Sequence, residues 1–442
     1  MRNANCADVA QTNNKVYKMH KKKRREKFMK KRILALLMAA TMVFGLAACG
    51  NKNEAGNTEN QKATDTKITV WVADAVVDFT KTKVDEWKAQ SETNGQFTVE
   101  VLPVGEDKAA SNMIVDVAGG ADIFGFAQDQ LTRLVGAGAV TPLMGDNATF
   151  VSTNNDAGAV GAAKMGDVTY AYPVTSDNGY FLYYDKSVLT DVSTLDSIIA
   201  QCEAAGKNFY FDIPNGWYSP AFFFAAGANI SYETDATGTF TKCNVNYASD
   251  AGVAALKALV QLAKSPSYQK GASVGDSVNA AAVVTGTWEK DKAISLWGDN
   301  MGCVKLPTAT IGGKQVQLSG FGGFKLLGVK PQTDAVKLAA CHSLAQFLSG
   351  EETQKARFEA VGWGPSNLNA QASDAIKADA ALSALAEQLA FTIPQGQYPD
   401  AYWSRCSSLG DDIIGGKYND MTDAQLLEVL TQLQNDFISY CN

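Results

Sequence analysis

The sequence predicts an α/β fold built on largely parallel sheets. Apolar, β-branched strand patterns alternate with helical stretches from residue 67 onward, which is the order of strand–helix–strand units. About 375 residues follow the polar N-terminal region, and a chain of that length is too long for one ordinary hydrophobic core. Polar side chains come directly after the predicted strands, where parallel sheets bind ligands. We therefore expect two domains and a ligand site at strand ends.

The elements follow in a regular order. Residues 67–72 (KITVWV) predict a first strand, and a helix is expected around 84–88. A second strand is predicted at 97–101, and a helix at 107–117 that ends at a glycine pair. Residues 121–126 predict the third strand. Farther along, 335–349 has apolar residues at helical spacing.

A secretory signal precedes this fold. Lys30, Lys31 and Arg32 come before 14 uncharged residues at 33–46, which is shorter than the roughly 18 apolar residues of a membrane-spanning helix. The run then ends in Leu-Ala-Ala-Cys49, which resembles the lipobox of bacterial lipoproteins. The resemblance implies that the sulfur of Cys49 is acylated and anchors the protein outside the cytoplasm. The alternative is a secreted protein in which Cys49 is incidental.

Residues 1–28 are polar and carry a basic cluster at 21–25, which is unlike a signal. A nucleic-acid patch is one interpretation of such a cluster. We instead expect translation to begin at Met29 and residues 1–48 to be leader and lipoprotein signal. Residues 49–66 hold no large apolar side chain between Gly50 and Thr66, which predicts a flexible tether.

The mature chain is acidic. Residues 1–48 hold 12 of the 39 Lys and Arg and 2 of the 46 Asp and Glu, which leaves 27 basic and 44 acidic residues and a net charge of −17. Nucleic acid is therefore excluded as a partner, because binding to phosphates depends on lysine and arginine.

Cysteine and histidine usage excludes several kinds of site. The cysteines after Cys49 are far apart and form no CxxC pair, which argues against zinc and thiol-redox chemistry: Cys202, Cys243, Cys303, Cys341, Cys406 and Cys441. Their spacing leaves any disulfide pattern open. The mature chain has one histidine, His342, which we expect at the surface or the edge of the core. No metal, cofactor or histidine-based catalytic triad is expected, and no GxxxxGK[ST] loop for ATP is present.

Five segments in the same order resemble the extracellular solute-binding proteins of sugar ABC importers, and within that class the maltose/maltodextrin-binding proteins. These segments are ADIFGFAQDQ at 121–130, GAGAVTPL at 136–143, AYP with YYDKSVL at 171–189, AAVVTGTW at 281–288 and VKLP at 304–307. Together they span most of the mature chain.

The resemblance implies a periplasmic-binding-protein-like fold with two lobes, each a mainly parallel sheet flanked by helices. The chain crosses between the lobes more than once, so each lobe is discontinuous. The first lobe is expected to hold 67–175 and 324–370, and the second 176–323 and 371–442. Glycines near 320–323 give the crossing segments backbone freedom for a hinge.

The resemblance also implies the binding residues. Aromatic rings stack on the apolar faces of sugars, and carboxylates and amides bind their hydroxyls. The expected aromatic contacts are Phe126, Trp217, Tyr218, Trp288, Trp363 and Trp403, and the expected polar contacts are Asp74, Gln128, Asp129, Gln130 and Asp177. Gln130 stands where maltodextrin binders carry an arginine, so the identity of the sugar stays open.

The implied function is capture without chemistry. A monomer, lipid-anchored on the outer face of a Gram-positive membrane, would bind an oligosaccharide, with malto-oligosaccharides as the first choice, and deliver it to the membrane permease of an ABC importer. A different oligosaccharide, or a peptide, amino acid or anion in the same fold, is an alternative. A surface glycoside hydrolase using Asp129 and Asp177 as paired carboxyls is the enzyme alternative.

Overall fold

The computed structural model describes residues 63, 65–235 and 237–441. The expected signal at 1–48, the start at Met29, the lipid anchor at Cys49 and most of the tether at 49–66 lie outside these residues. Within the part that is described, no helix combines the length and the apolar character needed to cross a membrane.

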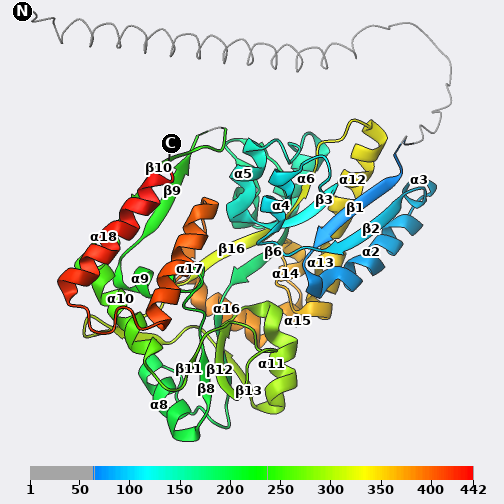
Figure 1. Cartoon of the computed structure of the whole chain (residues 1–442). Helices are drawn as coiled ribbons and strands as arrows, with labels where there is room; N and C mark the ends of the chain where they lie inside the picture. The colour runs from blue at the N-terminus through cyan, green and yellow to red at the C-terminus, as the bar shows by residue number, and fades with distance from the viewer. Residues whose placement is uncertain (1–62, 64, 236, 442) are drawn as a thin grey trace, which may run out of the picture. The chain divides into compact units, whose positions relative to one another are not determined.

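Two separate sheets organise the described chain (Figure 1). The first has six strands, in the order β17-β16-β3-β1-β2 with β6 also on β16. Its strands are β1 (Lys67–Val72), β2 (Thr98–Pro103), β3 (Ile123–Ala127), β6 (Ala171–Gly179), β16 (Phe321–Val329) and β17 (Ile393–Pro394). β1 is parallel to both β2 and β3, whereas β16 is antiparallel to β3 and β6. The predicted parallel unit at the start of the fold is therefore confirmed.

The second sheet has five strands in the order β11-β8-β12-β7-β13. They are β7 (Phe181–Asp185), β8 (Asn208–Tyr210), β11 (Tyr268–Gln269), β12 (Ala280–Thr285) and β13 (Met301–Val304). Three hairpins complete the strands: β4 (Lys164–Met165) with β5 (Val168–Thr169), β9 (Ile230–Thr234) with β10 (Phe240–Val245), and β14 (Thr308–Ile311) with β15 (Lys314–Gln317).

Helices surround both sheets. Those that precede β6 in the chain are α2 (Val77–Ala89), α3 (Glu92–Gly95), α4 (Ala109–Val115), α5 (Leu131–Gly136), α6 (Asp146–Asn154) and α7 (Ala157–Ala162). Those between β7 and β16 are α8 (Leu195–Ala205), α9 (Pro220–Ala226), α10 (Asp250–Ala263) and α11 (Lys290–Trp297). The remainder are α12 (Ala335–Leu348), α13 (Glu351–Val361), α14 (Leu368–Gln371), α15 (Asp374–Lys377), α16 (Ala380–Leu389), α17 (Asp400–Ile414) and α18 (Asp423–Ser439). Four short 3-10 helices are η1 (Asp74–Val76), η2 (Gln128–Gln130), η3 (Thr287–Glu289) and η4 (Gly298–Asn300).

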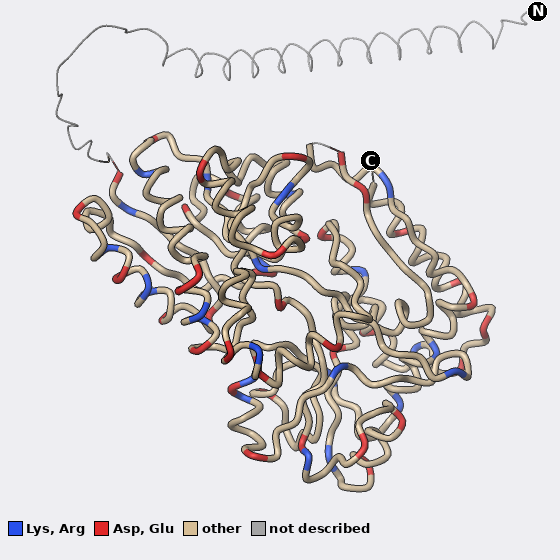
Figure 2. The backbone as a smooth tube through the Cα atoms, turned by 180° about the vertical axis from the view of Figure 1, so that it is seen from behind, with Lys and Arg blue, Asp and Glu red and all other residues tan. Residues whose placement is uncertain are grey.

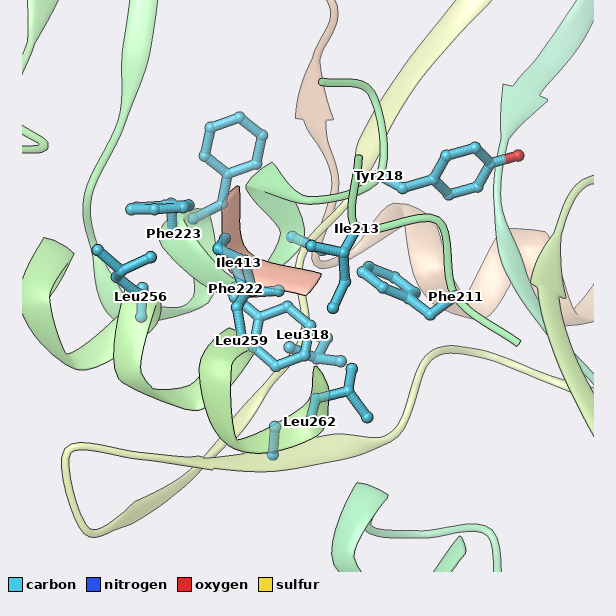
Figure 3. Packing of buried hydrophobic residues seen from close by; sticks show 14 of the residues in the cluster. Phe211, Ile213, Tyr218, Phe222, Phe223, Leu256, Leu259, Leu262, Leu318 and Ile413 are labelled. Atoms are coloured by element: carbon cyan, nitrogen blue, oxygen red, sulfur yellow. The ribbon is translucent and has the colours of Figure 1, made fainter. Parts of the chain in front are cut away.

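Each sheet has its own hydrophobic core. Side chains of the first sheet pack with α2, α4, α5 and α12 around Trp87, which is fully buried. One face of the second sheet packs against α8, α9, α10, α17 and α18. Figure 3 shows part of this core, where Phe222 and Phe223 of α9 lie beside Leu256 and Leu259 of α10. Two cores of this kind confirm the expected two-lobe α/β class.

Two of the places where the chain passes between the sheets lie side by side. β6 belongs to the first sheet and β7 to the second, with only Tyr180 between them. β16 returns to the first sheet beside β6, with Gly322 opposite Gly179 and Gly323 opposite Asn178. β6 runs past the lobe boundary predicted at 175, and β16 begins before the one predicted at 324. The boundaries themselves stay predictions.

The histidine and the cysteines of the described chain are structural. His342 is buried on α12 and its Nδ1 lies 3.0 Å from the hydroxyl of Tyr172. Burial lowers the pKa of this imidazole, so it is neutral at pH 7. None of the six cysteines between 202 and 441 forms a disulfide, and no cluster of metal-ligating side chains occurs among the described residues.

Candidate ligand-binding site

A cavity of about 850 Å³ lies where loops from both sheets meet. Its walls follow the carboxyl ends of four strands: Glu106 after β2, Asp129 after β3, Trp217 after β8 and Trp288 after β12. Ligands of open α/β sheets bind at this edge because the connecting loops converge there.

Five aromatic side chains predicted as ligand contacts line this cavity. Trp217, Trp288 and Trp403 are half-buried, whereas Tyr218 and Trp363 are buried. The rings of Trp217 and Trp288 lie 5.9 Å apart between centroids, at 42° to each other. Half-buried indoles keep part of an apolar ring available to a ligand.

Trp217 is held in place from several sides. Its backbone N–H donates to Oδ1 of Asn215 at 2.9 Å, and its indole N–H donates to Oε1 of Gln395 at 3.0 Å. Its ring meets that of Tyr180 edge-on at 4.8 Å. With its polar atom already bonded, this indole offers a ligand an apolar surface.

The position of the Trp288 ring requires a glycine two residues earlier, at 286. The indole lies across its own chain, and a Cβ on Gly286 would come within 2.1 Å of the ring. No larger residue at 286 could keep this ring position. The Gly-Thr-Trp motif at the end of β12 therefore allows the Trp288 ring to line the cavity.

Asp129 and Glu106 are two of the cavity's carboxyl groups that have no ion-pair partner among the described residues. Asp129 is 3% exposed, and burial raises its pKa to about 7 although Arg133 acts in the opposite direction. Burial also raises the pKa of Glu106, opposed chiefly by the charge of Lys325. Buried polar groups are normally hydrogen-bonded, so both carboxyls are suited to binding the hydroxyls of a ligand.

Of the other charged side chains that line the cavity, all but Asp212 and Lys325 form ion pairs. Arg133 of α5 forms an ion pair with Asp400 of α17, which links the two sides of the cavity. Lys292 lies 2.7 Å from Glu289, whose other oxygen accepts the backbone N–H of Val274 at 2.7 Å. Six acidic and four basic side chains line the walls. Figure 2 shows acidic and basic residues interspersed along the described chain, and the cavity has no basic cluster for an anion.

Four of the predicted contacts do not line the cavity. Phe126 is fully buried against Phe124, since alternate residues of β3 share a face and this face is covered by the core, so its predicted stacking role is wrong in this structure. Asp74 is exposed beside the cavity, between the lining residues Ala73 and Ala75.

Gln128 and Asp177 are occupied with protein contacts instead of lining the cavity. The Gln128 amide donates to the backbone carbonyl of Gln395. Asp177 is 1% exposed, and its Oδ2 accepts from the hydroxyl of Thr287 at 2.5 Å and from the N–H of Gly364 at 2.6 Å. It therefore joins β6 to the segments that carry Trp288 and Trp363. Gln130 does line the cavity, and its Oε1 accepts the N–H of Ala110 at 3.2 Å.

The structure adds residues that sequence reasoning missed, among them Glu106, Arg133, Lys325 and Gln395. Glu106 follows the predicted second strand, which is the position that led to Asp129. Lys325 is the only charged residue of β16, an otherwise apolar strand. Each of these signals was present in the sequence.

Comparison with known proteins gives one family match. Residues 74–384 match the family described as "Bacterial extracellular solute-binding protein". A galactooligosaccharide-binding protein of Bacillus subtilis (strain 168) is 22% identical over 416 residues, which cover 88% of this chain and 94% of that protein.

Solved structures match over nearly their whole length. One described "with acarbose" has a TM-score of 0.74 and 27% identity, and the match covers 84% of this chain and 98% of that one. The ligand-free maltodextrin-binding protein MalE1 of L. casei BL23 has a TM-score of 0.69 and 23% identity, with 84% and 98% covered. The maltotriose-binding protein of Thermus thermophilus, bound with maltotriose, has a TM-score of 0.66 and 16% identity, and the match covers 83% of this chain and 98% of that one. The last two support the fold alone.

Proposed function

Since this chain belongs to the bacterial extracellular solute-binding protein family, we propose that it captures an oligosaccharide outside the cytoplasm and delivers it to the permease of an ABC importer. The observation that carries the proposal is the cavity itself, where four indoles and a tyrosine alternate with unpaired carboxyls. Sugars present apolar C–H faces and hydroxyl edges, and these two kinds of side chain bind one each.

Seven predicted residues form the proposed binding surface. They are Asp129, Gln130, Trp217, Tyr218, Trp288, Trp363 and Trp403, and all of them line the cavity. The carboxyls bind hydroxyls, and the half-buried indoles stack on sugar rings.

Malto-oligosaccharides are the first candidate ligand. The structure matched at 27% identity was solved with acarbose, and the resemblance in the sequence is to maltodextrin binders. The relative from Bacillus subtilis is a galactooligosaccharide-binding protein, which makes galactooligosaccharides the second candidate. Gln130, in place of the arginine of maltodextrin binders, is consistent with either.

Attachment to the membrane through a lipid on Cys49 completes the proposal. An anchor of this kind keeps the binding protein beside its permease on a cell without an outer membrane. We propose that the protein works there as a monomer and without a cofactor.

Hydrolysis is not favoured by the arrangement of the carboxyls. A glycosidase needs two carboxyls on opposite sides of the scissile bond. Asp177, one of the two candidates, is committed to Thr287 and Gly364 and does not line the cavity. Members of the matched family are solute-binding proteins.

Calorimetric titration of the purified mature chain with maltose, maltotriose, maltotetraose, galactooligosaccharides and xylo-oligosaccharides tests the proposal. We expect binding of α-1,4-linked gluco-oligosaccharides with no shortened products after incubation. Binding of galactooligosaccharides alone would select the second candidate. Binding of no sugar, or release of shortened products, would refute the proposed function.

A further inference from the structure

Lys325 is the central residue of β16, whose other residues are all uncharged. The segment Phe-Gly-Gly-Phe precedes it and Leu-Leu-Gly-Val follows it. The residue is 6% exposed, and it lines the ligand cavity. Burying an ammonium group is costly unless it is paired and hydrogen-bonded, so this position needs an explanation.

The ammonium group lies against two aromatic rings and forms no ion pair among the described residues. Its Nζ lies 3.8 Å from the ring centroid of Trp363 and 4.9 Å from that of Trp288. Within the described part of the chain, no carboxylate oxygen lies within 4.0 Å of it and no protein acceptor takes a hydrogen bond from it. Cation–π contacts stabilise the charge but leave the three N–H donors free.

Lys325 also lies where two cavities meet. Among the described residues, Glu106, Lys325 and Trp363 line both the ligand cavity and a small adjoining space of about 20 Å³. That space is the size of a single water, and the buried side chain of Arg357 also lines it. The donors of Lys325 therefore face the ligand cavity and the small space behind it, where solvent or a ligand supplies acceptors.

We propose that Lys325 is a ligand-binding residue that donates charged hydrogen bonds to the hydroxyl oxygens of the oligosaccharide ring nearest Trp288 and Trp363. This inference rests on the proposed function and adds to it a cationic donor. Trp288 follows β12 of the second sheet and Trp363 follows α13, so the two indoles orient the ammonium group before the ligand arrives. Glu106 beside it supplies an acceptor, and the pair is suited to neighbouring hydroxyls of one sugar ring.

The test uses Lys325→Met and Lys325→Arg in the mature chain, titrated with whichever sugar of the panel the wild type binds most tightly. Methionine keeps the length and the apolar stem and removes the donors, so we expect affinity to fall about tenfold or more. Arginine keeps the charge, the donors and the stacking on indoles, so it should bind the sugar more tightly than the methionine variant.

Lys305→Met is the matched control. The ammonium group of Lys305 also lies over an aromatic ring, that of Phe391 at 4.7 Å, but Lys305 does not line the cavity. This variant should keep wild-type affinity. Thermal unfolding of all three variants is measured alongside, so that a fall in affinity is compared only between folded proteins.

The outcomes separate three conclusions. An affinity for Lys325→Met within twofold of wild type overturns the inference and leaves the proposed function intact. An arginine variant that binds no better than the methionine variant also overturns it, because a packing role alone would favour methionine. A wild-type chain that binds no sugar refutes the proposed function and this inference with it.

Discussion

At the residue scale, several side chains that suit ligand binding lower the stability of the ligand-free protein. Asp129 and Glu106 keep buried carboxyls without an ion-pair partner, and Lys325 keeps a buried ammonium without a carboxylate. Each group is costly in the ligand-free protein, and each has the hydrogen-bonding capacity that a sugar needs. Sites of this kind commonly reduce the stability of the empty protein.

The tryptophans of η3 and of α17 give the first prediction. Trp288→Ala and Trp403→Ala each remove a half-buried indole from the cavity wall, and we expect each to lower sugar affinity at least tenfold in calorimetric titration. Trp71→Ala is the control, because Trp71 is half-buried but does not line the cavity. Affinities within twofold of wild type for both cavity variants would show that the indoles do not contact the ligand.

Asp129→Asn is expected to raise the stability of the folded protein at pH 8 and to lower its affinity for sugar. The pKa of Asp129 in the folded protein is about 7, above the value of 3.8 for an exposed aspartate. The folded state therefore holds the proton more tightly than the unfolded state between about pH 4 and 7, and stability falls as the pH rises through that window. Asparagine removes this effect, so the variant should be more stable than wild type at pH 8, by on the order of 1–4 kcal/mol, and equally stable near pH 4.

The sugar affinity of the wild-type protein should increase with pH, whereas its stability decreases. The ionised carboxylate accepts hydroxyl hydrogen bonds, so wild-type affinity should rise between pH 5.5 and 8, while Asp129→Asn should gain less affinity over this range and bind more weakly than wild type at pH 8. Urea unfolding and calorimetry at four pH values measure both effects. A variant that is less stable than wild type at pH 8, or that keeps wild-type affinity, would contradict this account.

At the element scale, Asp177 connects three segments that carry or support the site. It lies on β6, bonds Thr287 at the start of η3, and bonds Gly364 next to Trp363. Trp288 is the next residue of η3 after Thr287, and Gly286 gives its ring the space it needs. The positions of two cavity tryptophans therefore depend on one buried carboxylate.

Asp177→Ala should destabilise the fold by about 3 kcal/mol, because it leaves a buried hydroxyl and a buried N–H unbonded. It should also weaken sugar binding through displaced indoles, although Asp177 does not line the cavity. Asp74→Ala is the control, since an exposed aspartate is expected to change stability by less than about 0.5 kcal/mol. Urea unfolding of the two variants measures the difference, and equal midpoints would disprove the connecting role.

At the scale of the whole molecule, two cores are joined by adjacent strands. β6 and β16 run side by side between the sheets, and the pairing of Gly322 with Gly179 marks the crossing. We expect a ligand that contacts both sides of the cavity to favour a closed arrangement of the two lobes by its additional contacts.

Ligand binding should therefore make the folded protein more compact and more stable. We expect the radius of gyration in small-angle scattering to fall when saturating sugar is added, and the unfolding temperature to rise with sugar concentration. Trp288→Ala should show neither change at the same sugar concentration. A rise in unfolding temperature without any change in radius would mean that the sugar binds without closure.

Local patterns explain which parts were predictable. β1 at 67–72 and α12 at 335–348 agree with the predicted bounds because their apolar spacing is intrinsic to each segment. Phe126 was misplaced because β3 is buried on both faces, and a continuous apolar strand does not show which face meets the core. Asp177 is predicted as a ligand contact because the sequence does not show that its carboxylate has protein partners. Those partners, Thr287 and Gly364, lie 110 and 187 residues away in the chain.

Composition and local periodicity are enough to predict the α/β class, the acidic mature chain and the aromatic residues at strand ends. Packing between distant segments selects which of these residues share a cavity and which are occupied by protein partners, and it brings Lys325 to the same cavity. Those choices depend on contacts between segments that are far apart in the chain, such as Asp177 of β6 with Thr287 and Gly364, which lie 110 and 187 residues away. Long-range packing of that kind has no local signature in the chain.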